Sequence, residues 1–260
     1  MNKIGLVLSG GGSRGIAHLG VLKFLDEIQI PIASISGSSS GAIAGALYSY
    51  GYTPDEIMEF IKEIKLFKLI KPAISKTGLL RMEATKALFS KFIKEDDFSA
   101  LKIPLTITST DLCQGKSVYF THGELIRPLM ASACIPVIFD PVKIGDSWFV
   151  DGGILNNFPT KPLVGQCDKI IGSHSNPVDE TFSLGNVKTM FERIFLLAIN
   201  GNSYNSVKDC DVFLEPPGLK KVKVFDLNIA KEIFKVGYEY ARSREKDIVN
   251  LLDHSSTKAS

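Results

Sequence analysis

Hydrophobic residues follow two different spacings along the chain. Short, nearly continuous apolar runs predict buried strands, and these runs lie near residues 3–9, 30–36, 103–110, 116–121, 147–151, 168–173 and 211–214. Longer segments, with apolar residues three or four positions apart, predict helices near residues 14–28, 40–50, 54–66, 80–94, 187–204 and 228–251. Because strands alternate with helices, the pattern predicts an α/β fold in three layers, with helices on both faces of a central sheet.

The central sheet is expected to be mixed, although mostly parallel. Two strand-like runs, 105–110 and 116–120, are separated by a short turn at Cys113-Gln114-Gly115, which is typical of an antiparallel hairpin. The chain has 260 residues, of which 45% are hydrophobic, enough to form one core without subdivision. We therefore expect a single domain over residues 1–260, with a frayed tail at residues 255–260.

The run Gly37-Ser38-Ser39-Ser40-Gly41 lies between a predicted strand and a predicted helix. It matches the G-x-S-x-G nucleophile elbow, in which a sharp strand-to-helix turn exposes a serine hydroxyl. Gly37 and Gly41 lack the side chains that would collide in so tight a bend. Ser39 is therefore the candidate nucleophile.

A second turn, rich in glycine, follows the first predicted strand and precedes a predicted helix. It consists of Gly10, Gly11, Gly12, Ser13, Arg14 and Gly15. Closely approaching backbone N–H groups at a helix N-terminus can bind an anion. The pattern G-x-G-x-x-G also occurs in dinucleotide sites, but such a site needs an acidic residue at the end of the second strand, where this chain has Ile35 to Ser39. We therefore expect the loop to face Ser39 as an oxyanion hole.

A serine nucleophile needs a base, and the chain has four histidines, His18, His122, His174 and His254. Only His174, which follows a predicted strand, has the position of a triad histidine. Asp151 is the stronger candidate, because it ends a predicted strand and is followed by Gly152 and Gly153.

The three motifs, in this order along the chain, closely resemble those of the patatin-like phospholipases. The flanking stretches Leu8 to Leu22, Ala131 to Pro141 and Asn156 to Pro159 resemble that family as well. The resemblance covers about residues 4–175, which we expect to be a patatin-like catalytic core. Residues 176–254 are expected to extend it with further strand and helix.

The resemblance implies a dyad in which Ser39 attacks an acyl ester and Asp151 accepts its proton. It also implies that N–H groups of Gly11, Gly12 and Ser13 hold the oxyanion, with Arg14 as electrostatic support. Since a free aspartate has a pKa of about 3.9, a base at neutral pH requires a poorly hydrated site. The implied activity is that of a serine-dependent lipid acyl hydrolase for phospholipids, lysophospholipids or simpler esters, without cofactor or metal.

Two other classes of function stay open. An acyltransferase would pass the acyl group from Ser39 to an alcohol or thiol. Transferases of similar fold pair the serine with a histidine, so His174 beside Ser39 would favour transfer, and Asp151 there would favour hydrolysis. The third hypothesis is a non-catalytic lipid-binding module, which is hard to reconcile with an intact nucleophile, base and oxyanion loop.

Charge and composition exclude other classes. A formal net charge of +2 is too small to indicate nucleic-acid binding. No window approaches the ~18 to 20 continuous apolar residues of a membrane span, and the apolar run at the N-terminus is needed as the first strand rather than as a signal peptide. The four cysteines are scattered without a C-x-x-C pair, so we expect reduced core thiols in a cytoplasmic chain.

Residues 55–71 combine an apolar helical face with recurring lysines. A basic amphipathic helix of this kind can lie on an anionic membrane surface, which would place the chain peripherally on the inner membrane face. In the alternative interpretation, which we favour, the apolar face belongs to the core and the lysines are its solvated side.

Overall fold

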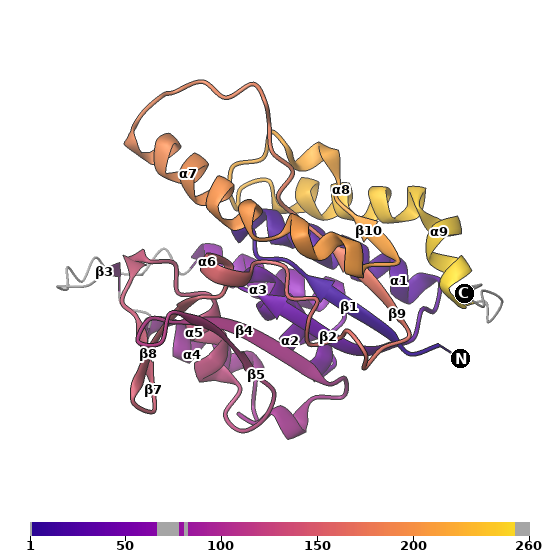
Figure 1. Ribbon diagram of the computed structural model, residues 1–260, viewed down its shortest axis with the longest axis horizontal. Helices are drawn as coiled ribbons and strands as arrows, with labels where there is room; N and C mark the ends of the chain where they lie inside the picture. The colour runs from indigo at the N-terminus through magenta and orange to yellow at the C-terminus, as the bar shows by residue number, and fades with distance from the viewer. Residues whose placement is uncertain (1, 67–77, 81–82, 253–260) are drawn as a thin grey trace.

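The computed structural model describes residues 2–66, 78–80 and 83–252, and it contains a central sheet with flanking helices (Figure 1). Eight strands among these residues form the sheet, in the order β10-β9-β1-β2-β4-β8-β7, and β5 pairs with β4. They are β1 (Ile4–Leu8), β2 (Ile32–Ser38), β4 (Leu105–Asp111), β5 (Lys116–Phe120), β7 (Val142–Ile144), β8 (Ser147–Asp151), β9 (Lys169–Ser173) and β10 (Val212–Leu214). Two short strands, β3 (Gly78–Leu80) and β6 (Val137–Phe139), pair outside it.

Helices flank the sheet, with α7 on the viewer's side and α2 and α3 behind it (Figure 1). The helices are α1 (Ala17–Glu27), α2 (Ser40–Tyr50), α3 (Pro54–Leu66), α4 (Glu83–Phe92), α5 (Ile126–Ser132), α6 (Gly153–Asn156), α7 (Val187–Gly201), α8 (Ala230–Ser243) and α9 (Glu245–Val249). Strands β10, β9, β1, β2 and β4 are parallel, and β5, β7 and β8 are antiparallel to their neighbours. The predicted α/β fold with a mixed, mostly parallel sheet is confirmed.

The element predictions fail mainly where elements are short. Strands β6 and β7 have three residues each, and α5 has seven, too few to establish a periodic pattern. The helix predicted over 14–28 begins as a 3₁₀ turn at Gly12–Ile16, and the helix predicted over 228–251 is interrupted at Arg244. The predicted tail at 255–260 lies outside the described residues.

Strand β4 explains how two distant strand ends meet. β5 pairs with one edge of β4 over most of its length, so β2 and β8 share the other edge. β2 runs parallel to β4 and ends with Ser38 opposite Thr108, whereas β8 runs antiparallel and ends with Asp151 opposite Ser109. Because Thr108 and Ser109 are consecutive, the register brings the carboxyl ends of β2 and β8 together.

The apolar face of α3 belongs to the core. Ile57 and Phe60 are buried in the main hydrophobic cluster, and Ile61 packs against it. These side chains are therefore not available to a membrane surface, while residues 67–71 of the predicted amphipathic segment lie outside the described residues. The expectation that all four cysteines are core thiols is wrong for Cys113, which is exposed in the turn between β4 and β5.

Helices α1 and α8 approach each other closely at two glycines. A Cβ atom on Gly237 would lie 2.0 Å from the carbonyl oxygen of Ala17, and one on Gly20 would lie 2.1 Å from that of Phe234. Because these oxygens belong to the backbone, the helices would have to move apart to admit a side chain. Contact at this distance fixes α8 against the helix that follows the glycine-rich loop.

We expect Gly237→Ala to lower the free energy of unfolding by about 1–3 kcal/mol, because the added methyl overpacks the contact by more than the better helix propensity of alanine offsets. Urea denaturation followed by circular dichroism measures this change. The matched control is Gly201→Ala in α7, where a Cβ atom has no neighbour within 4 Å. Equal stability of the two variants would contradict the packing argument.

Candidate active site

Ser39 lies at the turn between β2 and α2 in a strained backbone conformation. Its φ and ψ are 51° and −123°, values that a residue with a side chain seldom adopts. A Cβ atom on Gly41 would lie 2.3 Å from the carbonyl oxygen of Leu8, so only glycine fits there. The Ser39 N–H donates to Ser132 Oγ at 2.9 Å, which holds the turn in place. The predicted nucleophile elbow therefore has the expected geometry.

The carboxylate of Asp151 lies against the hydroxyl of Ser39. Ser39 Oγ donates to Asp151 Oδ2 at 2.6 Å, and the Gly153 N–H donates to Oδ1 at 2.8 Å. Asp151 is 1% exposed, and this burial raises its pKa to about 6, against the opposing effect of the two hydrogen bonds. The site thus contains the Ser39 hydroxyl and a carboxylate that is ionised at neutral pH and whose pKa lies close to that pH.

Three side chains hold the glycine-rich loop by one oxygen atom. The carbonyl oxygen of Gly10 accepts hydrogen bonds from Asn157, Ser175 and Asn176. In a planar trans peptide the C=O and N–H bonds point in opposite directions. The three donors therefore aim the N–H of Gly11 away from themselves.

The loop lies directly beside the candidate nucleophile. A Cβ atom on Gly10 would lie 3.0 Å from Ser39 Cβ, so the predicted juxtaposition of loop and serine is confirmed. Within the part of the chain that the structure describes, the N–H groups of Gly11 and Gly12 donate to no protein acceptor. These two donors are available to an oxyanion.

Ser13 contacts a segment from the far end of the chain. Its N–H donates to the carbonyl oxygen of Val224 at 2.8 Å, and its hydroxyl donates to that of Lys223 at 2.9 Å. We call residues 220–227, which lie over the loop, the strap. The Ser13 N–H, expected among the oxyanion donors, is thus already bonded to the strap.

The side chain of Arg14 is buried and binds three backbone carbonyls. It donates from Nε to Val222, from one Nη to Pro177 and from the other to Lys220, at 2.7 to 3.3 Å. Burial lowers its pKa to about 10, so it remains a cation at neutral pH. The guanidinium thus holds the strap and the glycine-rich loop together. The electrostatic support of an oxyanion by Arg14 stays a prediction.

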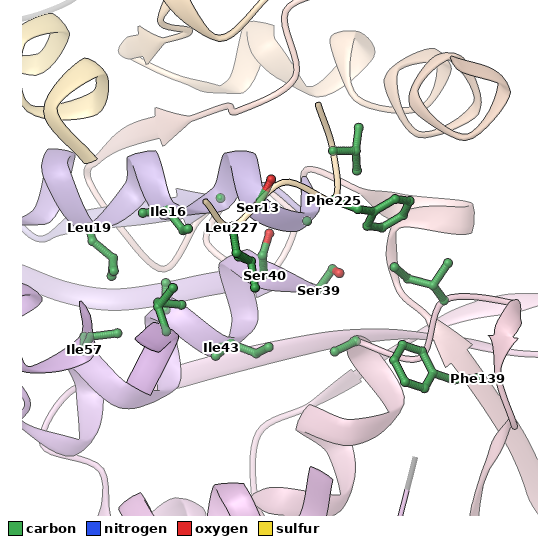
Figure 2. Close-up of a pocket in the computed structure, with 17 residues that line it drawn as sticks. Ser13, Ile16, Leu19, Ser39, Ser40, Ile43, Ile57, Phe139, Phe225 and Leu227 are labelled. Carbon is green, nitrogen blue, oxygen red and sulfur yellow. The ribbon is translucent and has the colours of Figure 1, made fainter. Parts of the chain in front are cut away.

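An apolar cavity of about 320 Å³ adjoins Ser39. Figure 2 shows the serine between Phe225 and Leu227 of the strap on one side and Ile43 and Phe139 on the other. Apart from backbone and the hydroxyls of Ser13, Ser39 and Ser40, the lining is hydrocarbon. A cavity of this character accommodates an alkyl chain and positions an attached carbonyl near the serine hydroxyl.

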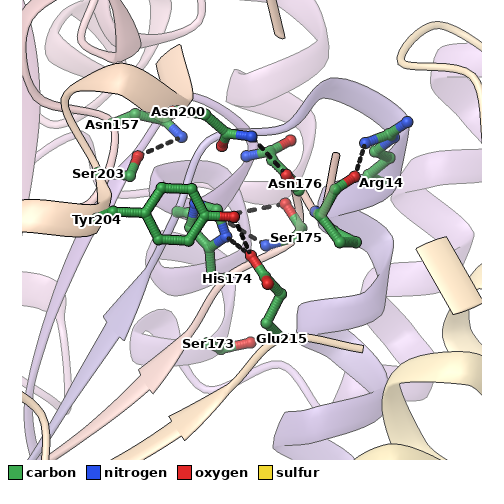
Figure 3. A network of polar contacts seen from close by, with 12 residues as sticks. Arg14, Asn157, Ser173, His174, Ser175, Asn176, Asn200, Ser203, Tyr204 and Glu215 are labelled. Carbon is green, nitrogen blue, oxygen red and sulfur yellow. Dashed lines mark hydrogen bonds and ion pairs between the residues drawn. The ribbon is translucent and has the colours of Figure 1, made fainter. Parts of the chain in front are cut away.

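The histidine candidates are engaged elsewhere. His174 is fully buried, and its Nδ1 pairs with Glu215 Oε1 at 2.7 Å rather than with Ser39 (Figure 3). His18 bonds to the Ser173 hydroxyl and the Ser9 carbonyl, and burial lowers its pKa to about 4, so it is neutral. Both histidines therefore lie in the support beneath the loop, whereas Asp151 is the group that contacts the serine.

The sequence analysis assigned no role to several residues that shape the site. Ser132 fixes the Ser39 backbone, and its hydroxyl donates to the Thr108 carbonyl at 2.6 Å. Ser132 and Asn157 stand in stretches that resemble the family, so the signal was present. Asn176 follows β9 without any motif, and its contact with Gly10 depends on the sheet order, which the sequence does not contain.

The fold agrees with the result of comparison with known proteins. The model of the patatin-like phospholipase family matches residues 6–164. The chain belongs to the patatin-like phospholipase family.

Two groups of relatives are informative. An uncharacterised NTE family protein of Mycobacterium tuberculosis is 36% identical over 166 residues, which cover 63% of this chain and 46% of that protein. Lysophospholipase NTE1 of Eremothecium gossypii is 32% identical over 189 residues, covering 68% of this chain and 12% of that protein. The chain spans less than half the length of these relatives.

Solved structures share the fold at low identity. VipD from Legionella pneumophila superposes with a TM-score of 0.66 at 13% identity, covering 96% of this chain and 67% of that one. Human GIVD cytosolic phospholipase A2 bound to a fluorophosphonate inhibitor gives a TM-score of 0.51 at 10% identity, covering 96% and 58%. Among the described residues, no helix is long and apolar enough to span a membrane, and no group of acidic, histidine and cysteine side chains is placed to hold a metal ion.

Proposed function

We propose that this chain is a lipid acyl hydrolase that uses Ser39 as nucleophile and Asp151 as base. The observation that carries the proposal is the 2.6 Å hydrogen bond between Ser39 Oγ and Asp151 Oδ2 beside an apolar cavity. Family membership and the NTE lysophospholipase relative support a phospholipid or lysophospholipid as substrate. An acyl chain would lie in the cavity, with its ester carbonyl at Ser39.

The chemistry follows from these contacts. Ser39 Oγ attacks the ester carbonyl carbon as its proton moves to Asp151, and the N–H groups of Gly11 and Gly12 receive the tetrahedral oxyanion. Collapse of this intermediate expels the alcohol, which takes the proton from Asp151 and leaves an acyl-serine. A water molecule then attacks the carbonyl carbon of the acyl-serine, and Asp151 takes its proton. The bond between the acyl carbon and Ser39 Oγ breaks, the fatty acid leaves, and Asp151 returns the proton to Ser39 Oγ.

A fluorophosphonate probe tests the assignment of the nucleophile. We expect mass spectrometry to find the probe on Ser39, and the unlabelled protein to hydrolyse p-nitrophenyl acyl esters and lysophospholipid. Labelling with turnover only when an alcohol or thiol acceptor is added would support the acyltransferase instead. Neither labelling nor turnover of any ester would contradict the proposal and leave a lipid-binding module.

The position of Asp151 favours hydrolysis over the alternatives. The histidine that would indicate a transferase, His174, pairs with Glu215. The strained backbone of Ser39 supports catalysis over simple binding, because such strain persists where a function requires it.

The pKa of Asp151 sets the expected pH dependence. Only the ionised carboxylate can accept the serine proton, so kcat/KM should rise with pH and level off above an apparent pKa of about 6. Below that pH it should fall about tenfold per pH unit. Ester hydrolysis in a buffer series, with the product quantified after transfer to base, measures the profile. A flat profile between pH 5 and 7, the range in which this carboxyl titrates, would exclude Asp151 as the base.

A further inference from the structure

Helix α7 exposes an apolar face to solvent. Four residues at spacings of three, four and three positions lie on one side of it, and we call them the α7 stripe: Val187, Met190, Ile194 and Leu197. Val187 is 77% exposed and Ile194 is 58% exposed. On the opposite side, Leu196 and Ile199 are buried. The helix is thus apolar on both its inner and its outer face.

Two charged residues of α7, Glu192 and Arg193, lie off the stripe. Glu192 is buried, and Arg193 is partly buried, with its guanidinium 5.1 Å from the centre of the Phe182 ring. An ordinary surface helix has the reverse arrangement, with charges outward. Phe182 and Leu184, in the segment before the helix, are also exposed. Exposed apolar side chains gathered on one helix in this way mark an interaction site in a folded protein.

A positively charged cleft lies between α7 and the strap, on the side of the helix that carries Arg193. Its volume is about 290 Å³, and α7 forms one wall and the strap the other. Five basic side chains line it, with two acidic ones, Asp179 and Glu192; the basic ones are Arg14, Arg193, Lys220, Lys221 and Lys223. The three lysines are exposed. The surface therefore combines apolar side chains with an excess of positive charge.

This surface is continuous with the candidate active site. Val224 of the strap lines both the charged cleft and the apolar cavity that contains Ser39. On another part of the cavity rim, Val137 is 66% exposed and lies between Ile135 and Phe139, which line the cavity. A lipid held against α7 and the strap would lie next to the cavity.

We propose that the α7 stripe together with Lys220, Lys221 and Lys223 docks on an anionic lipid bilayer and presents the active site to lipid esters in it. The inference rests on the proposed function, because it assigns the source of the substrate. Apolar side chains enter the acyl boundary, and lysines next to them are attracted to anionic headgroups, so both contribute to interfacial binding. The alternative occupant of the stripe is a second copy of the chain.

Vesicle flotation tests the docking surface. The probes are vesicles of phosphatidylcholine alone and with roughly one-third phosphatidylserine, a content that gives a negative surface potential. We expect wild type to bind the anionic vesicles, Ile194→Ser/Leu197→Ser to bind at least tenfold more weakly, and Lys220→Glu/Lys221→Glu/Lys223→Glu to lose the preference for anionic vesicles. Each variant should lose hydrolysis of vesicle lipid to a larger extent than hydrolysis of a soluble ester.

Matched controls change equally exposed side chains elsewhere. Leu112→Ser/Val164→Ser removes two exposed apolar residues, and Lys116→Glu/Lys161→Glu/Lys246→Glu makes the same change in charge. These controls should bind vesicles like wild type. Equal loss in controls and stripe variants, or no vesicle binding by wild type, would overturn the proposal.

Two further readouts separate the competing explanations. Sedimentation velocity that shows a wild-type dimer, a monomeric stripe variant and no vesicle binding would assign the stripe to self-association and overturn the docking proposal. Ser39→Ala should bind vesicles like wild type. Vesicle binding with no hydrolysis of any ester by wild type would refute the hydrolase and its docking role, whereas hydrolysis of soluble ester without vesicle binding would refute the docking surface alone.

Discussion

The Ser39→Ala variant should lose ester hydrolysis by a factor on the order of 10⁴ to 10⁶ while it keeps its fold. The Ser39 hydroxyl is the only side-chain group in the proposed mechanism that forms a bond to the acyl carbon, and a methyl group cannot replace it. Alanine is smaller than serine, so the cavity and the Ser132 contact to the backbone N–H are expected to persist. Steady-state kinetics with a p-nitrophenyl ester measures the loss, and circular dichroism checks the fold.

The neighbouring Ser38 supplies the control for this prediction. Its hydroxyl is buried and has no hydrogen-bond partner within the described part of the chain. Ser38→Ala removes the same atom one residue away, so it should retain activity within about threefold, as is usual where no interaction is lost. Similar losses in both variants would show that the effect comes from disturbance of the elbow rather than from loss of the nucleophile.

The Asp151→Asn variant should lower kcat by about 10³ to 10⁴, the range found when a base or its orienting carboxylate is replaced. An asparagine keeps the size of the side chain and the hydrogen bond from Gly153, but its amide cannot take the serine proton. We expect labelling of Ser39 by the fluorophosphonate probe to slow by a similar factor. Unchanged kinetics in Asp151→Asn would exclude the dyad.

The stability of Asp151→Asn at neutral pH should stay equal or rise, although its activity falls. Burial raises the pKa of Asp151 from its ordinary value of 3.8 to about 6, so the folded state binds the proton more tightly than the unfolded state. The resulting stabilisation, about 3 kcal/mol, is fully present below the unfolded pKa and is lost as pH rises through 6. At pH 7 to 8 the wild type therefore holds an unfavourable buried charge that asparagine removes.

Asp151→Asn should accordingly unfold at an equal or higher temperature than wild type at pH 8, where the wild-type carboxyl is ionised in the folded state. The difference in unfolding temperature should shrink toward pH 4, where that carboxyl is protonated in the folded state. Differential scanning calorimetry between pH 4 and pH 8 measures the unfolding temperatures of wild type and variant. A variant that loses activity and also unfolds earlier at pH 8 would assign Asp151 to structure. Loss of activity with retained stability identifies a residue held for its chemistry.

The sequence predicts the local parts of the site well. The turn at Ser39 and the turn at Gly10 each depend on a few consecutive residues, and glycine is required where a backbone oxygen approaches, as at Gly41. The proximity of Ser39 and Asp151 also depends on the order of strands about β4. The resemblance to the family supplied that information, since spacing along the chain does not determine which strands share an edge.

Other features could not be predicted because they depend on partners far along the chain. The donors to the Gly10 carbonyl come from two later segments, and the strap over the loop comes from residues beyond 219. Residues 55–71 illustrate a pattern that left two interpretations open, a membrane contact and, as we favoured, a core helix. Amphipathic spacing is the same whether the apolar face meets a core or a lipid, and in α3 the described apolar side chains meet the core.

The hydrogen bonds that Ser13 and Arg14 donate to the strap all end on main-chain oxygens. Arg14 and Ser13 bind carbonyls of Pro177, Lys220, Val222, Lys223 and Val224, and every amino acid supplies such an oxygen. The identity of the strap side chains is therefore not constrained by these hydrogen bonds, provided that the path of the backbone is retained. Side chains of the strap can thus change, and with them the face that the strap presents to its surroundings, without loss of the hydrogen bonds to the loop beneath it.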